Sequence, residues 1–425
     1  MAKEPSTKRK VASNTFYQLA GKGVSMSITV LATMIVAKMY GREDYGNFSL
    51  MQSWPAFFFI IADFGINAIS VRELAKDWSK VDKYFNSVLV LRTVFSIFLV
   101  ILLSGVLLLF PYSSDLIFGI RLSLLLILTQ SLYSTTNIVF QSQMRYDYST
   151  VGYISGYVVI LLLILITSFL DVDIVWFNFS YVVGGLCTFL VNMRYVKKLG
   201  IRVTYKIDKR LCKSIILQSL PLGLMFIFSQ MSFKEDAIML SFLRLPASYG
   251  LNNTESVAVY SLPYKVFEVT LVVPTFFMNA AFPVLVKHME RGQKKLKKTL
   301  RAILEYMVVG GVGSGILVYN FAPRIVEILG GSEFNESISV LRILSLGFVL
   351  FYITSPLSWL IVAFEKQSEL PKIYAASALF NLVSNLIFIP IYSFYAATVI
   401  TLLSELLGLI LLIYSVMKMW RMRYA

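Results

Sequence analysis

Six basic side chains lie inside or at the mouths of apolar runs long enough to cross a lipid bilayer: Lys22, Arg92, Arg121, Lys234, Lys265 and Arg342. A cation at the centre of a lone helix costs roughly 2.5 to 3.5 kcal/mol on insertion scales, so such residues mark a polar interior and usually a substrate path. The chain carries a net charge of +15. We therefore expect an anionic substrate.

Depth separates these cations. At a rise of about 1.5 Å per residue, Lys22 and Lys265 lie near the middle of their spans and Lys234 lies in the outer third. Arg92 lies in the inner third, whereas the remaining two lie close to the outer mouth, where a long side chain reaches the headgroups. The predicted substrate-binding residues are therefore Lys22, Arg92, Lys234 and Lys265.

Acidic residues inside the spans have two competing roles. Lys265 and Glu268 are spaced i,i+3 on one helix face and predict a self-neutralising pair. The charges at 234–236 are consecutive, so they fan out in different directions around their helix. Asp63 and Glu405 have no basic residue within a helical turn, so they either pair across helices with a membrane cation or titrate. Asp63, Glu268 and Glu405 are thus candidates for ion coupling or charge pairing.

The elements that must hold these charges are membrane helices. Hydrophobic residues make up 57% of the 425 positions and charged residues 15%, which excludes an ordinary soluble fold and a disordered chain. Nearly unbroken apolar blocks at 100–110 and 158–170 exclude the alternating pattern of a β-barrel. Since a span needs about 20 apolar residues, the sequence predicts an all-α polytopic membrane protein with about twelve spans, at residues 13–37, 46–70, 85–110, 115–140, 150–170, 174–193, 213–243, 256–286, 302–322, 337–362, 371–391 and 395–417.

The positions of Lys and Arg predict the orientation. With a cytoplasmic N-terminus, 29 of the 39 basic residues fall in cytoplasmic segments and four in outer segments, as the positive-inside rule requires. Both termini are therefore expected in the cytoplasm. The first apolar run is too long for a cleavable signal and lacks a small-residue cleavage site. Basic runs such as 294–298 predict contact with anionic membrane lipids and no binding of nucleic acid.

A basic connection divides the spans six and six. Residues 194–213 carry eight cations, which predicts an N-terminal bundle at 1–193, a basic cytoplasmic linker at 194–212 and a C-terminal bundle at 213–425. The segment 45–50 matches 257–262 at an offset of 212 residues. Because each half has an even number of spans, the halves would be parallel repeats related by a pseudo-twofold axis along the membrane normal, with the substrate site at their interface.

Several spans contain residues that loosen a helix. Pro55 interrupts the second span, Pro221 the seventh, Pro263 and Pro274 the eighth, and Pro356 the tenth. Proline removes a backbone donor and permits bending, which suits helices that change curvature during alternating access.

Other chemistry finds no support in the sequence. Cys187 lies deep in a span and Cys212 at a cytoplasmic end, so no disulfide is expected, and no Cys or His cluster predicts a metal site. The glycines at 310–315 lack the Gly-Lys-Ser/Thr of a phosphate-binding loop and predict close helix packing. We expect no cofactor, so transport would have to be ion-coupled, potential-driven or passive.

Ordered motifs along nearly the whole chain resemble those of one transporter family. The N-terminal signature of that family is resembled by four segments of this chain, Ala37-Lys-Met-Tyr-Gly41, Tyr45-Gly46, Ala62-Asp-Phe-Gly65 and Arg72-Glu-Leu-Ala75. Downstream segments follow in order, at Ala258 to Ser261 with Lys265 and Glu268, Phe282-Pro283, Pro323 to Gly331, Leu341 to Leu344, and Asn381 to Glu405. The set resembles Wzx-type polysaccharide flippases of the multidrug/oligosaccharidyl-lipid/polysaccharide (MOP) exporter superfamily. Lys38 and Tyr40 stand where that family usually has Arg and Leu.

The resemblance implies two six-helix bundles around a central cavity in a bacterial cytoplasmic (inner) membrane. It further implies that the substrate is an undecaprenyl-pyrophosphate-linked oligosaccharide for surface polysaccharide such as O-antigen, flipped to the outer leaflet by alternating access. A cationic cavity matches the pyrophosphate. An H+ or Na+ counter-ion and other polysaccharide assembly proteins are the partners that such a role implies.

Other functions compete with this hypothesis. A cation-coupled multidrug exporter of the same superfamily would present carboxylates rather than lysines at the centre of its cavity. A lipid II exporter of the superfamily is a further alternative, and twelve spans rather than fourteen argue against a MurJ-type lipid II flippase. An integral membrane enzyme of glycan assembly commonly has a large outer loop with reactive residues. The outer loops here are short and the one histidine, His288, lies on the cytoplasmic side, so we expect a transporter and not an enzyme.

Overall fold

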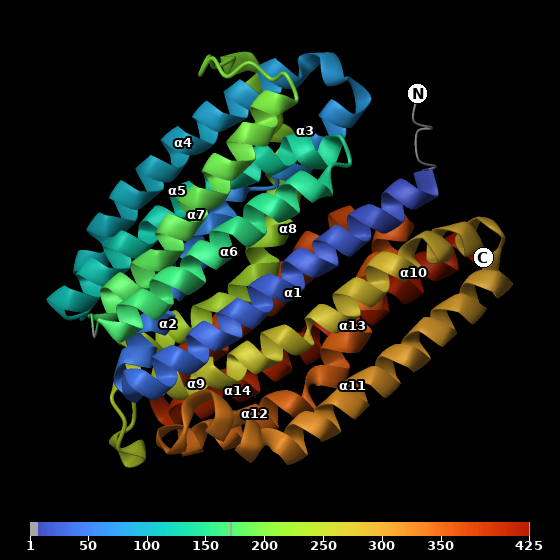
Figure 1. The fold of residues 1–425 in the computed structure, drawn as a ribbon. Helices are drawn as coiled ribbons and strands as arrows, with labels where there is room; N and C mark the ends of the chain where they lie inside the picture. The colour runs from blue at the N-terminus through green and yellow to red at the C-terminus, as the bar shows by residue number, and fades with distance from the viewer. Residues whose placement is uncertain (1–6, 171, 425) are drawn as a thin grey trace. The chain divides into compact units, whose positions relative to one another are not determined.

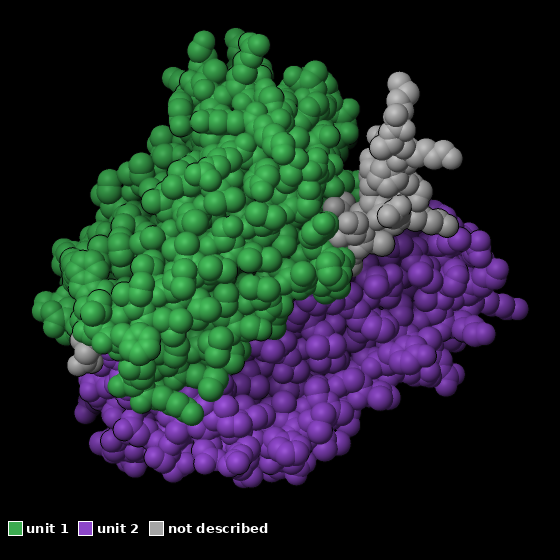
Figure 2. Space-filling model, in the orientation of Figure 1, with its two compact units in different colours: residues 1–39, 50–227 green, residues 40–49, 228–425 purple. Residues whose placement is uncertain are grey.

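The computed structural model describes residues 7–170 and 172–424, which form fourteen α-helices joined by short loops and 3-10 turns. No strand occurs among these residues, which confirms the predicted all-α class. The chain comprises two compact units, residues 1–39 with 50–227 and residues 40–49 with 228–425 (Figure 2). The boundaries predicted around the basic segment 194–212 stay predictions, since this division describes packing alone.

Unit 1 is a bundle of long helices that lie side by side (Figure 1). Its helices are α1 (Thr7–Met39), α2 (Gly41–Asp63), α3 (Ile66–Lys76), α4 (Val81–Val106), α5 (Ser114–Ser142), α6 (Tyr146–Phe169), α7 (Ile174–Lys198) and the first part of α8 (Lys209–Phe242). The first turns of α2, up to Ser49, belong to unit 2.

Unit 2 is a second helical bundle. It contains the second part of α8, from Phe228, with α9 (Asn253–Thr270), α10 (Val272–Glu290), α11 (Gln293–Gly330), α12 (Asn335–Leu346), α13 (Phe348–Ala363) and α14 (Leu370–Tyr424). A 3-10 turn, Ser332–Phe334, leads into α12.

The last helix accounts for two of the predicted spans. Eleven helical segments of the described residues are long and apolar enough to cross a membrane, and the last of them, Gln367–Tyr424, is 58 residues long. Inside it Ser393 is non-helical, with φ 50°. The Ser377 hydroxyl donates to the Ser404 carbonyl over 2.6 Å, although a straight helix would place residues 27 positions apart roughly 40 Å from each other. The chain therefore reverses at Ser393, and eleven segments hold twelve spans.

Four of the five prolines named in the sequence do not break their helices, whereas α9 ends at Thr270 and α10 begins at Val272, just before the fifth, Pro274. The helices continue through Pro55, Pro221, Pro263 and Pro356. In the second span, the break comes instead after Asp63, where Phe64 and Gly65 both have positive φ. The prediction that Pro55 interrupts that span is thus wrong, because the break lies after Asp63. Neighbouring helices in a membrane can satisfy the backbone groups that proline frees, so proline need not break a span.

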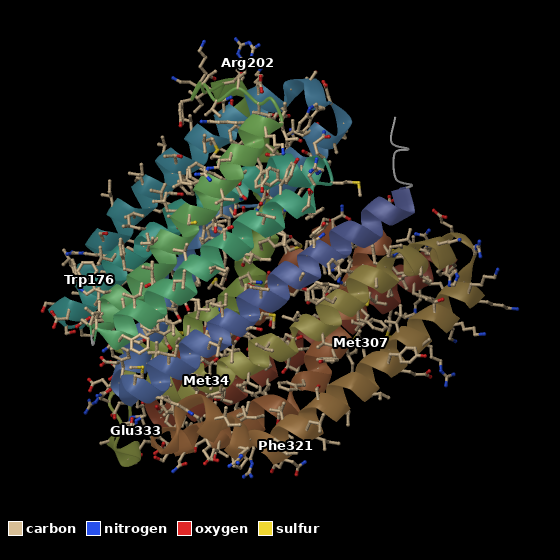
Figure 3. The ribbon with its side chains drawn as sticks, in the orientation of Figure 1. Met34, Trp176, Arg202, Met307, Phe321 and Glu333 are labelled. Carbon is tan, nitrogen blue, oxygen red and sulfur yellow. The ribbon has the colours of Figure 1, made fainter. Side chains whose placement is uncertain are left out.

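Apolar side chains cover the outsides of these bundles. On α4, Val94, Phe98 and Ile101 are each more than half exposed, and on α11 Phe321 is similarly exposed (Figure 3). Such surfaces are stable only when lipid covers them. Together with the eleven long apolar segments, they identify a multi-pass membrane protein.

The basic segment after α7 is docked on unit 1. The buried Asn86 side chain of α4 donates to the Arg202 carbonyl over 2.7 Å and accepts from the Thr204 and Tyr205 amides over 2.7 and 3.0 Å. Lys83 contacts Asp208 at 2.7 Å, and this hydrogen bond lowers the pKa of the Asp208 carboxyl. Trp176, near the start of α7, and Arg202, just past its end, lie at opposite ends of unit 1 (Figure 3).

Candidate functional site

Two of the predicted cations share one carboxylate in unit 2. Lys265 and Glu268 lie one turn apart on α9, and the Lys265 Nζ lies 3.4 Å from Glu268 Oε2. Lys234, on α8, donates from Nζ to the other carboxylate oxygen, Oε1. All three side chains are about one quarter to one third exposed. The predicted pair is therefore part of a cluster of three residues, the lysine cluster, with a net charge of +1.

A second cluster surrounds Asp236 and is called the Asp236 cluster here. Asp236 Oδ2 accepts hydrogen bonds from the Tyr260 hydroxyl at 2.5 Å and the Thr401 hydroxyl at 2.8 Å. Its Oδ1 accepts from the Asn385 amide at 2.6 Å. Asp236 is fully buried. No basic side chain among the described residues forms an ion pair with it, so three neutral donors hold the carboxylate.

Glu235 extends the Asp236 cluster. It is 5% exposed, and its Oε2 atom has no hydrogen-bond partner among the described residues. With the Asn381 amide turned so that its nitrogen faces the carboxylates, that nitrogen donates to Glu235 Oε1 over 2.6 Å. Buried polar atoms without partners are costly. The two adjacent carboxylates are thus held by hydroxyl and amide donors, and one oxygen, Glu235 Oε2, is left without a donor among the described residues.

Sequence reasoning missed the Asp236 cluster. The consecutive charges at 234–236 were expected to fan out, but nothing local indicated where each would point. The partners of Asp236 lie 24, 149 and 165 residues away. One signal was available: Asn381 and Asn385 are spaced i,i+4 within an apolar span, so both amides lie on one face of α14.

The predicted cation and acid of unit 1 form an ion pair. Arg92, on α4, contacts Asp63 at the end of α2, with Nη2 at 2.5 Å from Oδ1. The Arg92 side chain is 1% exposed, and a second nitrogen, Nη1, lies 3.4 Å from the Thr135 hydroxyl. Of the two roles open to Asp63, pairing across helices is the one found. A role for Arg92 in substrate binding stays a prediction.

The other predicted cations differ in their surroundings. Lys22, on α1, is exposed, and the described part of the chain contains no ion pair to it. Arg121 donates to the Ser104 carbonyl at 3.0 Å. The Arg342 guanidinium lies 5.3 Å from the centre of the Tyr319 ring. The two arginines at the mouths thus have local partners, and Lys22 is the mid-span cation left without a counter-charge in the described structure.

Glu405 lines a small cavity in unit 2. The cavity has a volume of about 30 Å³, and its polar lining includes Tyr374, Ser377, Thr401 and Ser404. This volume holds a water molecule or an ion of similar size. Thr401 also binds Asp236, and with the Asn381 amide turned toward the carboxylates its oxygen accepts from the Ser404 hydroxyl at 3.1 Å. The cavity and the Asp236 cluster are therefore adjacent.

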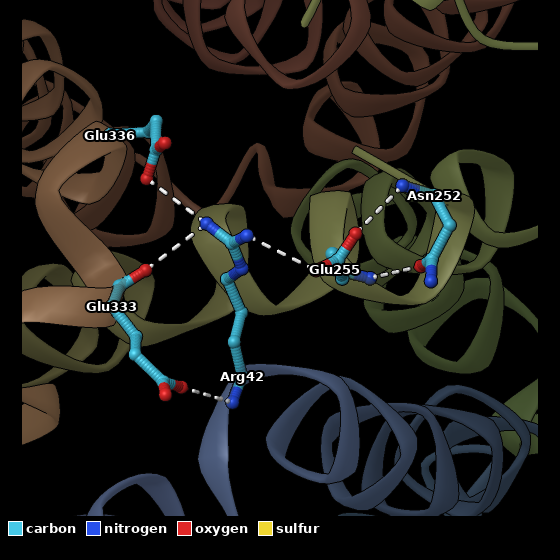
Figure 4. A network of polar contacts seen from close by, with 5 residues as sticks. All are labelled: Arg42, Asn252, Glu255, Glu333 and Glu336. Carbon is cyan, nitrogen blue, oxygen red and sulfur yellow. Dashed lines mark hydrogen bonds and ion pairs between the residues drawn. The ribbon is translucent and has the colours of Figure 1, made fainter. Parts of the chain in front are cut away.

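Arg42 organises a further polar network in unit 2 (Figure 4). Its guanidinium contacts Glu255 at 3.1 Å and Glu336 at 3.2 Å and also donates to the Glu333 carbonyl at 3.1 Å. Glu255 and Asn252 form a capping box at the start of α9. A cleft of about 500 Å³ lies beside these residues. Arg42 thus braces the first turn of α2 against α9 and α12.

Comparison with protein families gives one match. A family model described as polysaccharide biosynthesis protein matches residues 11–289, about two thirds of the chain. No match to a curated protein was found.

Solved structures match over nearly the whole chain. The structure of lipid II flippase MurJ in an inward closed conformation is 14% identical, with a TM-score of 0.78 over 94% of this chain and 87% of that chain. An inward-facing MATE family multidrug transporter of the MOP superfamily is 14% identical, with a TM-score of 0.75 over 93% and 96%. A MOP superfamily transporter from Pyrococcus furiosus, described as having a binding pocket of reverse polarity, is 16% identical, with a TM-score of 0.64 over 97% and 96%. At such identities the matches show the fold, which is that of MOP superfamily transporters.

Proposed function

The chain belongs to the polysaccharide biosynthesis protein family, as its resemblance to Wzx-type flippases predicted, and on this premise we propose that it flips a lipid-linked oligosaccharide. The substrate is an oligosaccharide repeat unit on undecaprenyl pyrophosphate, carried from the cytoplasmic to the outer leaflet of a bacterial inner membrane by alternating access. The product serves surface polysaccharide synthesis. The protein makes and breaks no covalent bond, and both of its termini are cytoplasmic.

The observation that carries this proposal is the lysine cluster. Lys265 lies within a membrane-spanning segment, Lys234 lies on α8 just past the end of another, and both contact one carboxylate, so the cluster keeps a positive charge. Lysine is a common ligand of phosphate groups. Because cations in membrane spans are costly, their retention indicates a function, and binding a pyrophosphate is the function that fits their charge.

The proposed roles differ among the predicted residues. Lys22, Lys234 and Lys265 bind the pyrophosphate, and Arg92 assists near the inner side while it stays paired with Asp63. Asp63 and Glu268 already face cations, so they are weak candidates for ion coupling. Glu405 and the Asp236 cluster are better candidates for the H+ or Na+ counter-ion, since carboxylates at membrane depth mark ion pathways.

Leaflet-resolved translocation tests the proposal. Purified protein is reconstituted into liposomes that carry a fluorescent undecaprenyl-pyrophosphate oligosaccharide, and the fraction accessible to an external quencher is followed with time. The triple variant Lys22→Gln/Lys234→Gln/Lys265→Gln should lose at least about 10-fold in rate, since hydrogen bonds to charged groups contribute roughly 1.5 to 3 kcal/mol each. The matched control is Lys294→Gln/Lys297→Gln/Lys298→Gln, which removes the same charge from exposed cytoplasmic lysines. Equal rates for the two variants would refute the assignment.

A second candidate function has one observation in its favour. A cation-coupled exporter was expected to present carboxylates at the centre of its cavity, and Glu235 and Asp236 are two buried carboxylates on α8. The same liposomes separate the two functions when loaded with a lipophilic cationic dye. An exporter would move the dye along an ion gradient and leave the lipid-linked oligosaccharide in place.

A further inference from the structure

The lysine cluster has the geometry of a filled anion site. Lys234 binds Glu268 Oε1 and Lys265 binds Glu268 Oε2, so two ammonium groups approach two oxygens of one anion. A phosphoryl group offers the same arrangement of acceptor oxygens with a larger charge. Glu268 therefore occupies the position in which these lysines would hold a phosphate.

One turn before Glu268 on α9 lies a buried hydroxyl without a partner. Tyr264 is 6% exposed, and its hydroxyl has no hydrogen bond among the described residues. Helical side chains lean toward the N-terminus, so the Glu268 side chain lies over the turn that contains Tyr264. An unsatisfied buried donor next to carboxylates suggests a partner in another state of the protein.

We propose that Glu268 is an internal counter-anion that the substrate's pyrophosphate displaces from Lys234 and Lys265, and that the Tyr264 hydroxyl then receives the displaced carboxylate. This inference rests on the proposed function and names the event that accompanies substrate binding. Glu268 is bound in both states, by two lysines when the site is empty and by Tyr264 when it is filled. Tyr264 is thus a positioning residue that acts through Glu268.

The exchange has a consequence for affinity. The lysines are paired before and after substrate binds, so the substrate gains only the difference between its own contacts and those of Glu268. Transport requires binding that is strong enough for entry and weak enough for release. Removing the Glu268 charge should therefore tighten anion binding, whereas removing the Tyr264 hydroxyl should weaken it.

A double-mutant cycle tests the exchange. Farnesyl pyrophosphate is titrated by calorimetry into the purified full-length protein and into the variants Glu268→Gln, Tyr264→Phe and the double variant. We expect binding about 10-fold tighter in Glu268→Gln and about 10-fold weaker in Tyr264→Phe, within the usual range of coupling between sites and of lost buried hydrogen bonds. In the Glu268→Gln background, Tyr264→Phe should have no effect, because no charged carboxylate remains to be received.

The control variant is Tyr352→Phe. Tyr352 is another buried tyrosine of unit 2, and its hydroxyl donates to the Thr270 carbonyl at 3.2 Å. Its substitution should leave the affinity unchanged, and thermal unfolding of every variant shows whether the fold is kept. Weaker binding in Glu268→Gln would show that Glu268 organises the lysines, which overturns the inference. An equal effect of Tyr264→Phe in both backgrounds would also overturn it. If the unmodified protein does not bind farnesyl pyrophosphate, the proposed function itself fails.

Discussion

Arg92 and Asp63 form one ion pair but differ in burial. The Arg92 side chain is 1% exposed, whereas that of Asp63 is 26% exposed. Asp63→Asn leaves a buried guanidinium without a counter-charge, which we expect to cost about 3 kcal/mol. Arg92→Met leaves a carboxylate that water still reaches, and we expect about 1 kcal/mol. Thermal unfolding in one detergent measures both changes.

The double variant tests whether the loss of stability comes from the buried charge that is left without a partner. Arg92→Met with Asp63→Asn removes both charges, so it should be more stable than Asp63→Asn alone. If Arg92→Met is the more harmful single change, then the arginine contributes more than the charge balance of the pair. In that case its predicted contact with substrate would gain support.

Asp236 is the residue on which the predicted ion dependence of transport is best tested. Asp236→Asn keeps the size of the side chain and removes the charge that Tyr260, Thr401 and Asn385 surround. We expect the variant to fold and to lose the stimulation of oligosaccharide flipping by a Na+ or H+ gradient. The stimulation is compared with that of the unmodified protein and of the variant Glu305→Gln, which removes an exposed carboxylate from α11. Retained stimulation in Asp236→Asn would exclude the Asp236 cluster as the coupling site.

At the residue scale, the sequence indicated which charges matter but not how they pair. The Lys265 and Glu268 pair was predictable because i,i+3 neighbours share a helix face. The third member, Lys234, lies on another helix, and its side chain is long enough to reach in several directions. Distant partners of this kind depend on tertiary packing, which composition and spacing do not determine.

At the scale of helices, the spans were predictable and their breaks were not. Long apolar runs determine where a helix crosses, so the described segments correspond to the predicted spans. The break after Asp63 depends on local packing instead. Gly65 has φ 71°, and a Cβ atom there would lie 3.1 Å from Leu222 Cβ. Glycine is favoured at this position because the backbone is left-handed and because a side chain would crowd the neighbouring helix.

The docking of the basic segment on α4 also gives a prediction. Asn86→Ala removes the bonds to the Arg202 carbonyl and to the Thr204 and Tyr205 amides. With each hydrogen bond contributing about 1 kcal/mol and part of the freed groups reaching water, we expect a loss of about 2 kcal/mol. The segment should also become more accessible to trypsin, which cuts after its lysines and arginines.

Limited proteolysis separates local from global effects of Asn86→Ala. Cleavage within 194–213 should accelerate, while cleavage within 287–301, another basic segment, should not change. Equal acceleration at both segments would indicate general unfolding. A segment cleaved at the same rate in both proteins would show that these hydrogen bonds do not hold it in solution.

At the scale of the whole molecule, the reversal at Ser393 decides the number of crossings. Counted by length, the described helices give eleven segments, and an odd number would place the two termini on opposite sides. The contact between Ser377 and Ser404 divides the last segment in two and restores an even number. Twelve crossings place the two termini on the same side of the membrane. The distribution of Lys and Arg predicts that this side is the cytoplasm.

Reporter fusions and cysteine labelling test this topology. Green fluorescent protein fused after the last residue should fluoresce and alkaline phosphatase at the same position should be inactive, because the first folds in the cytoplasm and the second outside it. In a background with Cys187→Ser and Cys212→Ser, a membrane-impermeant maleimide should label Arg324→Cys in intact cells and Lys198→Cys only after lysis. An active phosphatase fusion would mean that the last helix crosses once, and the orientation of every span after the reversal would then have to be reassigned.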